Sequence, residues 1–387
     1  MPALHWAMTR SGPETMNIGE AMTGRRRPFA SSGGRLMKRI PFPGSSRCRH
    51  ILTTYLNQRI KHYNKNRAWA YLGGNCVGPG PRHHGGWFPI ARLPMFPTKS
   101  FTHRGVDLAY MVAGQGPPVM LLHGWPFHKA SFRKLIPLLA DRFTCYALDA
   151  AGMGESGWLP DTDFGFRAHA GRVRALADHL GFERYSVVGH DTGGTVARFL
   201  AAEDGARVDR VVVLDSECPG HRPWMIPPLQ KLMRSRPGRR VMKRVMAMPG
   251  FARLALGGCF VDKTLLDAEF RRLFVGFWLA DDRRFGGLAG YLCGIDFALV
   301  DELADLHRRI EAPVLFVWGA RDTIFPRRMA ERVAREAPCC HAFIAVEQAG
   351  FLAHEERPAE VARHIADFLE AATQPLPQAR PARHQGR

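Results

Sequence analysis

The sequence predicts an α/β fold in which helices cover a mostly parallel β-sheet. From Phe101 onward, short apolar runs alternate with segments whose apolar residues recur at helical spacing. The run PPVMLLHG at 117–124 is long and apolar enough for a fully buried strand. At 387 residues and 46% hydrophobic content, the chain also has enough apolar material for a large core.

Strands and helices are predicted in alternation along this part of the chain. The predicted strands are residues 106–114, 117–124, 143–150, 185–191, 208–216, 312–319 and 341–350. One helix is expected to end at Gly181, which suits a left-handed cap, and a last helix has Ile365 and Phe368 on its apolar face. About a hundred residues separate the strands at 208–216 and 312–319, which is too long for a simple crossover. Their helical patterns predict an inserted helical cap at 219–296, between core segments at 95–218 and 297–372.

The net charge of +19 lies mostly at the two ends of the chain. Residues 1–94 hold 15 Lys or Arg against Glu14 and Glu20, a net +13, and three arginines after residue 372 add +3. The first 94 residues are rich in Gly, Pro, Ser and Arg without sustained periodicity, so we expect a disordered arm or residues upstream of a true start at Met95. A disordered tail is expected at 373–387. A nucleic-acid or membrane contact of the arm is the less favoured alternative.

Other features of the composition argue against metal binding and membrane insertion. The eight cysteines show no CxxC pair and no regular spacing with histidines, so we expect reduced thiols and no metal. No run of about 18 apolar residues is present, which predicts no transmembrane helix. We therefore expect a soluble cytoplasmic protein with a small-molecule substrate. The sequence leaves the oligomeric state open, a homodimer included.

The segment VVGHDTGG at 187–194 carries the sharpest chemical signal. Asp191 lies where a buried strand turns directly into a helix, and Gly189 and Gly193 flank it because a Cβ at either position would collide across the turn. Such a turn directs the side chain of residue 191 into a cleft, beside the backbone N–H of Thr192 and the start of the helix. A glycine-rich helix start with a capping aspartate is the alternative interpretation.

Two neighbouring motifs favour a reactive site at this turn. HGWP at 123–126 follows the first buried strand, so the backbone N–H of Trp125 is placed to join that of Thr192 in an anion hole. Asp322 comes three residues after Gly319, which puts its carboxylate at the carboxyl edge of the sheet. Open α/β sheets have their sites at this edge.

The stretch from about residue 101 to 372 resembles the α/β-hydrolases, and GHDTGG resembles their aspartate-nucleophile branch of epoxide hydrolases, haloalkane dehalogenases and fluoroacetate dehalogenases. The resemblance implies an eight-stranded sheet, a helical cap, Asp191 as nucleophile, Asp322 as the acid that orients a histidine, and no cofactor. A carboxylate attacks an sp3 carbon to give an ester, which water then hydrolyses. We expect nearby N–H groups to keep the pKa of Asp191 low.

The sequence departs from this pattern at the histidine that activates the water. Aligning Glu356, Arg357 and Pro358 with the family puts Phe351 at that position. His354 lies one helical turn later, so it is the candidate base, and a structural histidine at a helix start is an equal alternative. Asp215, at the end of the strand after the turn, is the reserve for Asp322.

The group that receives the leaving atom decides between an epoxide and a halide. Tyr291 is the single tyrosine of the predicted cap and the candidate donor to an epoxide oxygen, with cap packing as its alternative. Many haloalkane dehalogenases have tryptophan where this chain has Thr192, which counts against a halide. We expect a hydrolase that forms an ester on Asp191 with a small apolar epoxide or halide. A ligand-binding member without turnover, suggested by Phe351, and a function of the basic arm are the alternatives.

Overall fold

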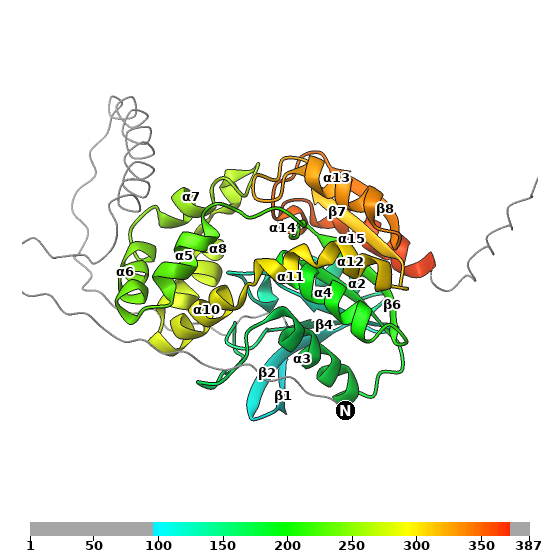
Figure 1. Ribbon diagram of the computed structural model, residues 1–387, viewed down its shortest axis with the longest axis horizontal. Helices are drawn as coiled ribbons and strands as arrows, with labels where there is room; N and C mark the ends of the chain where they lie inside the picture. The colour runs from blue at the N-terminus through cyan, green and yellow to red at the C-terminus, as the bar shows by residue number, and fades with distance from the viewer. Residues whose placement is uncertain (1–95, 372–387) are drawn as a thin grey trace, which may run out of the picture. The chain divides into compact units, whose positions relative to one another are not determined.

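The computed structural model describes residues 96–371, so the predictions for the basic arm and the tail lie outside the described residues (Figure 1). Eight strands form one sheet in the order β1-β2-β4-β3-β5-β6-β7-β8. Their bounds are β1 Thr98–His103, β2 Val106–Ala113, β3 Pro118–Leu122, β4 Thr144–Leu148, β5 Tyr185–His190, β6 Val208–Leu214, β7 Val314–Gly319 and β8 Cys340–Val346.

The sheet is mostly parallel, which confirms the predicted fold class. Strand β2 pairs antiparallel with β1 and with β4, and the pairs from β4 through β8 are all parallel. The sequence TKSFTH of β1 is polar and mostly exposed, because β1 lies at the edge of the sheet. That is why hydrophobic patterning alone did not single out β1.

Consecutive apolar residues in the central strands serve two separate cores. Val187 of β5 packs in one cluster with helices α3 (Phe166–His179) and α4 (Thr192–Glu203), whereas Val188 packs in the other. The second cluster includes α2 (Ile136–Leu139) and α15 (Pro358–Glu370). Side chains alternate between the two faces of a strand, so a strand covered by helices on both faces needs an unbroken apolar run.

Shorter helical segments complete the part of the chain around the sheet. They are η1 Lys129–Phe132, α11 Phe297–Asp301, α12 Leu303–Leu306, η4 His307–Arg309, α13 Arg327–Glu336 and α14 Ala353–Glu356. Among residues 96–371, no helix combines the length and the apolar content needed to span a membrane. The six cysteines in this range are free thiols.

A group of helices lies between β6 and β7 in the sequence and to one side of the sheet in space (Figure 1). We call these segments the cap: α5 Ile226–Met233, α6 Arg236–Met246, α7 Phe251–Leu256, η2 Lys263–Leu265, α8 Ala268–Arg271, η3 Arg272–Gly276, α9 Phe277–Leu279 and α10 Asp282–Gly294. Two indoles tie the cap to the loop after β3. Trp125 Nε1 donates to Leu288 O at 3.0 Å, and Trp278 Nε1 donates to Pro126 O at 2.8 Å. The division into 95–218, 219–296 and 297–372 stays a prediction.

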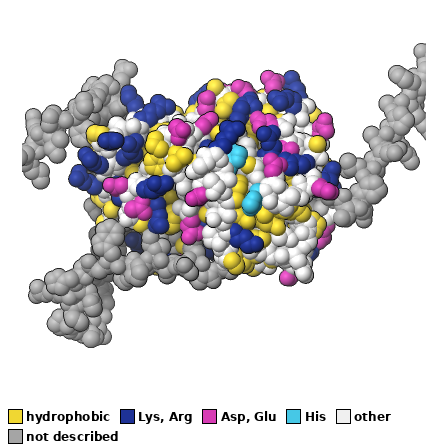
Figure 2. Space-filling view, turned by 90° about the horizontal axis from the view of Figure 1, so that it is seen from below, with side chains coloured by type: hydrophobic (Ala, Val, Ile, Leu, Met, Phe, Trp, Pro, Cys, Tyr) yellow, Lys and Arg dark blue, Asp and Glu magenta, His cyan; other side chains and the backbone are white. Residues whose placement is uncertain are grey.

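Helix α6 is amphipathic, and its two faces have different roles. Lys and Arg side chains gather at the end of the molecule that the cap occupies (Figure 2), and α6 contributes to them through its sequence RPGRRVMKRVM. Its Met242 and Met246 point the other way and line an internal cavity. The basic face is therefore solvated while the methionine face belongs to the interior.

Three backbone segments approach closely at the turn from β5 to α4. A Cβ built on Gly189 would lie 2.2 Å from Gly193 O, and one built on Gly193 would lie 2.1 Å from Leu122 O. No real Cβ tolerates such contacts with backbone, so both positions require glycine for lack of space. This close approach presses the start of α4 against the end of β3.

We expect Gly193→Ala to lower the free energy of unfolding by about 1–3 kcal/mol, because the added methyl group meets backbone that is unable to yield. Gly171→Ala in α3 is the matched control, since its Cβ would meet nothing within 4 Å. The control should raise stability by about 0.5–1 kcal/mol, as alanine suits a helix interior better than glycine. Urea unfolding of both variants checks this, and equal stability of the two would contradict it.

Candidate active site

Asp191 stands at the junction of β5 and α4 in a strained backbone conformation. Its φ is +54°, a value that residues other than glycine rarely adopt. Its side chain makes no capping hydrogen bond to α4, so the alternative interpretation as a helix cap finds no support. Instead, Oδ2 accepts the backbone N–H of Trp125 at 2.8 Å. A Cβ on Gly124 would lie 2.3 Å from Oδ2, so glycine at this position leaves room for the carboxylate.

The Asp191 carboxylate lies at the wall of an apolar cavity of about 180 Å³. The loop after β3, the β5–α4 turn, the cap and the segments after β6, β7 and β8 all contribute lining residues. Most of these are apolar: Trp125, Pro126, Pro223, Met225, Ile226, Leu229, Met233, Met242, Met246, Phe251, Ala255, Leu256, Phe274, Val275, Leu288, Ile295, Phe297, Ile324, Phe325 and Phe351. Asp191 and Glu217 are the acids among the described lining residues, and none of these is Lys, Arg or His.

The structure brings Trp125, Thr192 and Asp191 together, as the motifs predict. Besides its bond to Asp191, the N–H of Trp125 lies 3.1 Å from Thr192 Oγ1. That oxygen also shares a hydrogen bond of 3.1 Å with the Tyr291 hydroxyl. Asp191 thus faces two backbone N–H groups, those of Trp125 and Thr192, and both lower the pKa of its carboxyl. Their role as an anion hole stays a prediction.

The expectation of a low pKa for Asp191 is wrong in direction. Burial is the largest effect on this carboxyl, and the charge of Glu217 acts in the same sense, so the pKa lies well above its ordinary value. The N–H groups of Trp125 and Thr192 oppose the shift without cancelling it. Sequence reasoning counted these N–H groups and left out a second acid in the same cavity.

Glu217 follows β6 and is held by a buried polar network that the sequence analysis did not predict. Its Oε2 accepts the hydroxyl of Thr195 at 2.7 Å and that of Ser216 at 3.1 Å. Arg198, itself buried, donates through Nη2 to both hydroxyl oxygens and to Glu217 O. Ser216 Oγ also donates to Asp191 O at 2.7 Å, so the network contacts the backbone of the β5–α4 turn. In the sequence, Arg198 within the apolar run TVARFLAA was the feature that indicated a buried polar network.

Asp322 is buried in the segment after β7 and bonds two residues that line the cavity. Its Oδ1 accepts the N–H groups of Ile324 and Phe325 at 2.7 and 3.1 Å, and within the described residues Oδ2 has no hydrogen-bond partner. Burial raises the pKa of this carboxyl to about 7. Asp215 has less freedom, because its oxygens accept the N–H groups of Gly319 and Ala353.

Phe351, rather than a histidine, lines the cavity after β8. Its ring packs 4.8 Å from that of His190 and 5.9 Å from that of Phe325. The structure does not bring His354 to the cavity: its ring lies behind, 4.5 Å from His190 and 5.3 Å from Phe132. Neither ring nitrogen of His354 has a partner in the described chain, and burial lowers its pKa well below the ordinary value. These contacts give His354 no path to Asp191, and its role as base stays a prediction without support.

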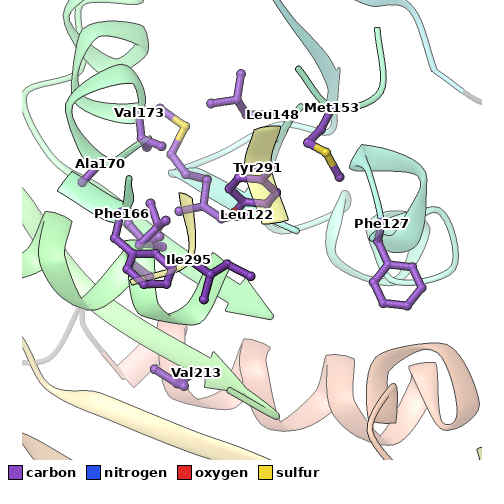
Figure 3. Packing of buried hydrophobic residues seen from close by; sticks show 14 of the residues in the cluster. Leu122, Phe127, Leu148, Met153, Phe166, Ala170, Val173, Val213, Tyr291 and Ile295 are labelled. Carbon is purple, nitrogen blue, oxygen red and sulfur yellow. The ribbon is translucent and has the colours of Figure 1, made fainter. Parts of the chain in front are cut away.

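Tyr291 lies near Asp191 without facing the cavity that Asp191 lines. Figure 3 shows its ring among the side chains of Leu122 and Leu148, with which it lines a separate small pocket. Its hydroxyl bonds Thr192, and burial raises its pKa. The indole N–H groups of Trp125 and Trp278 are taken by backbone carbonyls. The Tyr291 hydroxyl, which the sequence suggested as the donor to an epoxide oxygen, and these two indole N–H groups are therefore engaged elsewhere.

Among residues 96–371, no cluster of three or more His, Cys, Asp or Glu side chains is arranged to hold a metal ion. Cys259 lines the cavity, and burial raises the pKa of its thiol to about 12. The thiol is therefore neutral near pH 7. Sequence reasoning also missed the cap methionines of the lining, although the amphipathic pattern of α6 indicated them.

Known proteins resemble this chain in both sequence and fold. A soluble epoxide hydrolase of Corynebacterium sp. (strain C12) is 43% identical over 111 residues, which are 29% of this chain and 38% of that enzyme's length. Haloalkane dehalogenase 2 of Mycobacterium bovis is 27% identical over 291 residues, 72% of this chain and 97% of that enzyme. The solved structure of the epoxide hydrolase CorEH without ligand superposes with a TM-score of 0.60 at 26% identity, covering 71% of this chain and 99% of that one.

The family model described as alpha/beta hydrolase fold matches residues 117–358, which hold β3 through β8, the cap and the Asp191 turn. This match agrees with the observed strand order and with the fold of the solved relative. The chain therefore belongs to the α/β-hydrolase family.

Proposed function

We propose that the protein opens an epoxide, or displaces halide from an alkyl halide, by forming an ester between the substrate carbon and Asp191. The observation that carries this proposal is the Asp191 carboxylate, which is held at 2.8 Å by the Trp125 N–H at the wall of an apolar cavity. A carboxylate attacks an sp3 carbon without help from a base, unlike a serine hydroxyl. The similarity to an epoxide hydrolase and to a haloalkane dehalogenase supports the same chemistry.

The cavity favours a small, neutral, apolar substrate. Its volume of about 180 Å³ exceeds the roughly 150 Å³ that suffices for an apolar cavity to bind benzene. A substrate carboxylate would meet Asp191 and Glu217 with no cation among the described lining residues, which argues against haloacids. Arg222, which follows β6 in the sequence, is not among the lining residues and pairs with Asp301.

A second candidate function rests on Phe351. Its phenyl ring lines the cavity and takes no proton from water, so the ester on Asp191 would lack the usual base. The protein would then bind its ligand, or trap it covalently, without turnover. The alternative that places the function in the basic arm concerns residues 1–94, which lie outside the described residues.

Ester formation should depend on the buried Asp191 and on no exposed acid of this domain. After incubation with styrene oxide and a bromoalkane panel, mass spectrometry should find an adduct on the peptide that contains Asp191. Asp191→Asn should abolish the adduct, because an amide is a poor nucleophile toward an sp3 carbon. Asp305→Asn, at an exposed ion pair, is the matched control and should behave as the wild type. Adduct or product at the wild-type rate in Asp191→Asn would refute the proposal.

The rate of ester formation should rise with pH through the raised pKa of Asp191, because only the ionised carboxylate attacks. Burial and the charge of Glu217 are the two largest causes of that shift, and Asp322 adds to it. Glu217→Gln removes one repulsive charge, so the Asp191 pKa should fall and the rate profile should move to lower pH. Stopped-flow alkylation by 1-bromohexane checks this. A profile that stays in place would show that Glu217 does not act on Asp191.

The ester should be hydrolysed faster once an imidazole stands beside Asp322. Phe351→His introduces a ring at the cavity, and Oδ2 of Asp322, which has no partner among the described residues, is the expected acceptor for one of its N–H groups. Base catalysis of this kind contributes about 10²-fold to 10⁴-fold. Phe351→Leu, which adds no base, is the control. Equal adduct lifetimes in the two variants, measured by mass spectrometry, would contradict the prediction.

A further inference from the structure

Glu217 shares the cavity with Asp191 and has no assigned role in the chemistry described so far. Its side chain is 4% exposed, and that exposure is to the cavity it lines. Glu217 is fixed on the other side by Thr195 and Ser216, whose hydroxyls both reach Oε2. Burying an acid without partners costs several kcal/mol. The hydrogen bonds to Glu217 offset this cost and hold its carboxyl in a fixed position.

The hydrogen-bond network around Glu217 includes the buried guanidinium of Arg198. Arg198 Nη2 lies 3.1 Å from Thr195 Oγ1 and 2.8 Å from Ser216 Oγ. Thr195 Oγ1 accepts from the guanidinium and donates its own proton to Glu217 Oε2, whereas the single proton of Ser216 is shared between Asp191 O at 2.7 Å and Glu217 Oε2 at 3.1 Å. The network therefore stabilises the ionised form of Glu217 and fixes its orientation.

The other lining groups are unsuited to proton transfer. Phe351 carries no ionisable group, and the Cys259 thiol is neutral near pH 7 because burial raises its pKa to about 12. Tyr291 and His354 do not line this cavity. Among the described lining residues, Glu217 is thus the one carboxyl besides Asp191.

We propose that Glu217 is the proton donor and acceptor of this site, as the acid when Asp191 opens an epoxide and as the base when water hydrolyses the ester. The inference rests on the proposed function, with Asp191 as nucleophile. It deepens that function by replacing the missing histidine and by selecting epoxides as the substrate class.

The first step requires the form of the pair in which the shared proton lies on Glu217 and Asp191 is ionised. A carboxylate oxygen of Asp191 attacks one epoxide carbon, and the C–O bond on the other side of that carbon breaks. The electron pair of that bond stays on the epoxide oxygen, which takes the proton of Glu217. The products of this step are a hydroxyalkyl ester on Asp191 and an ionised Glu217.

In the second step, Glu217 takes a proton from water while the water oxygen bonds to Cγ of Asp191. The oxyanion that forms lies beside the N–H groups of Trp125 and Thr192. Collapse breaks the ester C–O bond, and the departing alkoxide takes the proton back from Glu217, which yields the diol. Asp191 is left as a carboxylic acid and passes its proton to Glu217, so both groups return to their starting states.

The electrostatics of the pair suit this cycle. Two acids that face one apolar cavity repel each other, so they hold one proton between them over a range of pH. Burial raises the pKa of Glu217, and its hydrogen bonds and Arg198 limit the rise. The titratable or charged groups that face Glu217 are Asp191, Arg198, Cys218 and Tyr291. Esterification removes the charge of Asp191, which favours the ionised Glu217 that the second step needs.

The test compares the full-length wild type with Glu217→Gln, and with Glu302→Gln as the matched control at an exposed ion pair. Styrene oxide and 1-bromohexane are reacted in H₂¹⁸O under single-turnover conditions, and mass spectrometry follows the peptide that contains Asp191. The bromide leaves without a proton, so Glu217→Gln should form the hexyl ester at least as fast as the wild type. The ester should then decay about 10²-fold to 10⁴-fold more slowly and incorporate no ¹⁸O. Styrene oxide should form its ester more slowly in the same variant.

The outcomes separate the two proposals. If the hexyl ester decays in Glu217→Gln as it does in the wild type, Glu217 is not the base and the inference is overturned. A wild-type ester that never decays overturns it as well, while leaving Asp191 as nucleophile. No ester on Asp191 with either reagent removes the proposed function and the inference with it.

Glu217→Asp guards against loss of the fold, because it keeps a carboxylate opposite Arg198. Thermal unfolding should show this variant folded, with an ester lifetime between those of the wild type and Glu217→Gln. General damage to the site would slow ester formation from both reagents, whereas loss of the base spares the bromide step. Wild-type decay in both Glu217 variants would overturn the inference.

Discussion

The close contact of backbone at the β5–α4 turn is the constraint on which the rest of the site depends. Gly193 lies against Leu122 O and Gly124 lies against the Asp191 carboxylate, so the loop after β3 and the start of α4 touch without side chains between them. This contact holds Asp191 at a φ of +54° and puts its Oδ2 at the Trp125 N–H. The strained backbone is what turns the carboxylate away from its own helix and toward the cavity.

The same contact buries the carboxyl of Asp191. Buried carboxyls then determine which hydrogen-bond donors the neighbouring residues must supply. A carboxylate removed from water must find donors or take a proton. Asp191 finds two N–H groups, Glu217 finds two hydroxyls backed by Arg198, and Asp215 finds the N–H groups of Gly319 and Ala353. None of these sets fully compensates burial, because the pKa of each of the three carboxyls stays above its ordinary value. The carboxyls of this site therefore hold their protons to higher pH than isolated acids do.

The parts that local sequence determines were predictable, and the parts that depend on packing depth were not. Glycines around residue 191 fix a turn within a few residues, so the sequence located Asp191, Thr192 and Trp125 together. Spacing put His354 on the expected helical face, yet it gave no information on whether the ring reaches the cavity or lies behind His190. Tyr291 likewise lies near the site in space, but packing turns its hydroxyl to Thr192. The partners of Arg198 come from α4 and from the segment after β6, which no local pattern relates.

Phe351 changes what the remaining acids have to do. An imidazole at that position would need an acceptor for one ring N–H, and Oδ2 of Asp322 has no partner among the described residues. Leaving a buried ionised oxygen without a donor costs free energy, and a carboxyl avoids that cost by taking up a proton. A pKa of about 7 for Asp322 means that the neutral form is available at ordinary pH, so the fold tolerates the missing ring. The proton chemistry that the ring would have performed is then left to a group that does face the cavity, and Glu217 is that group.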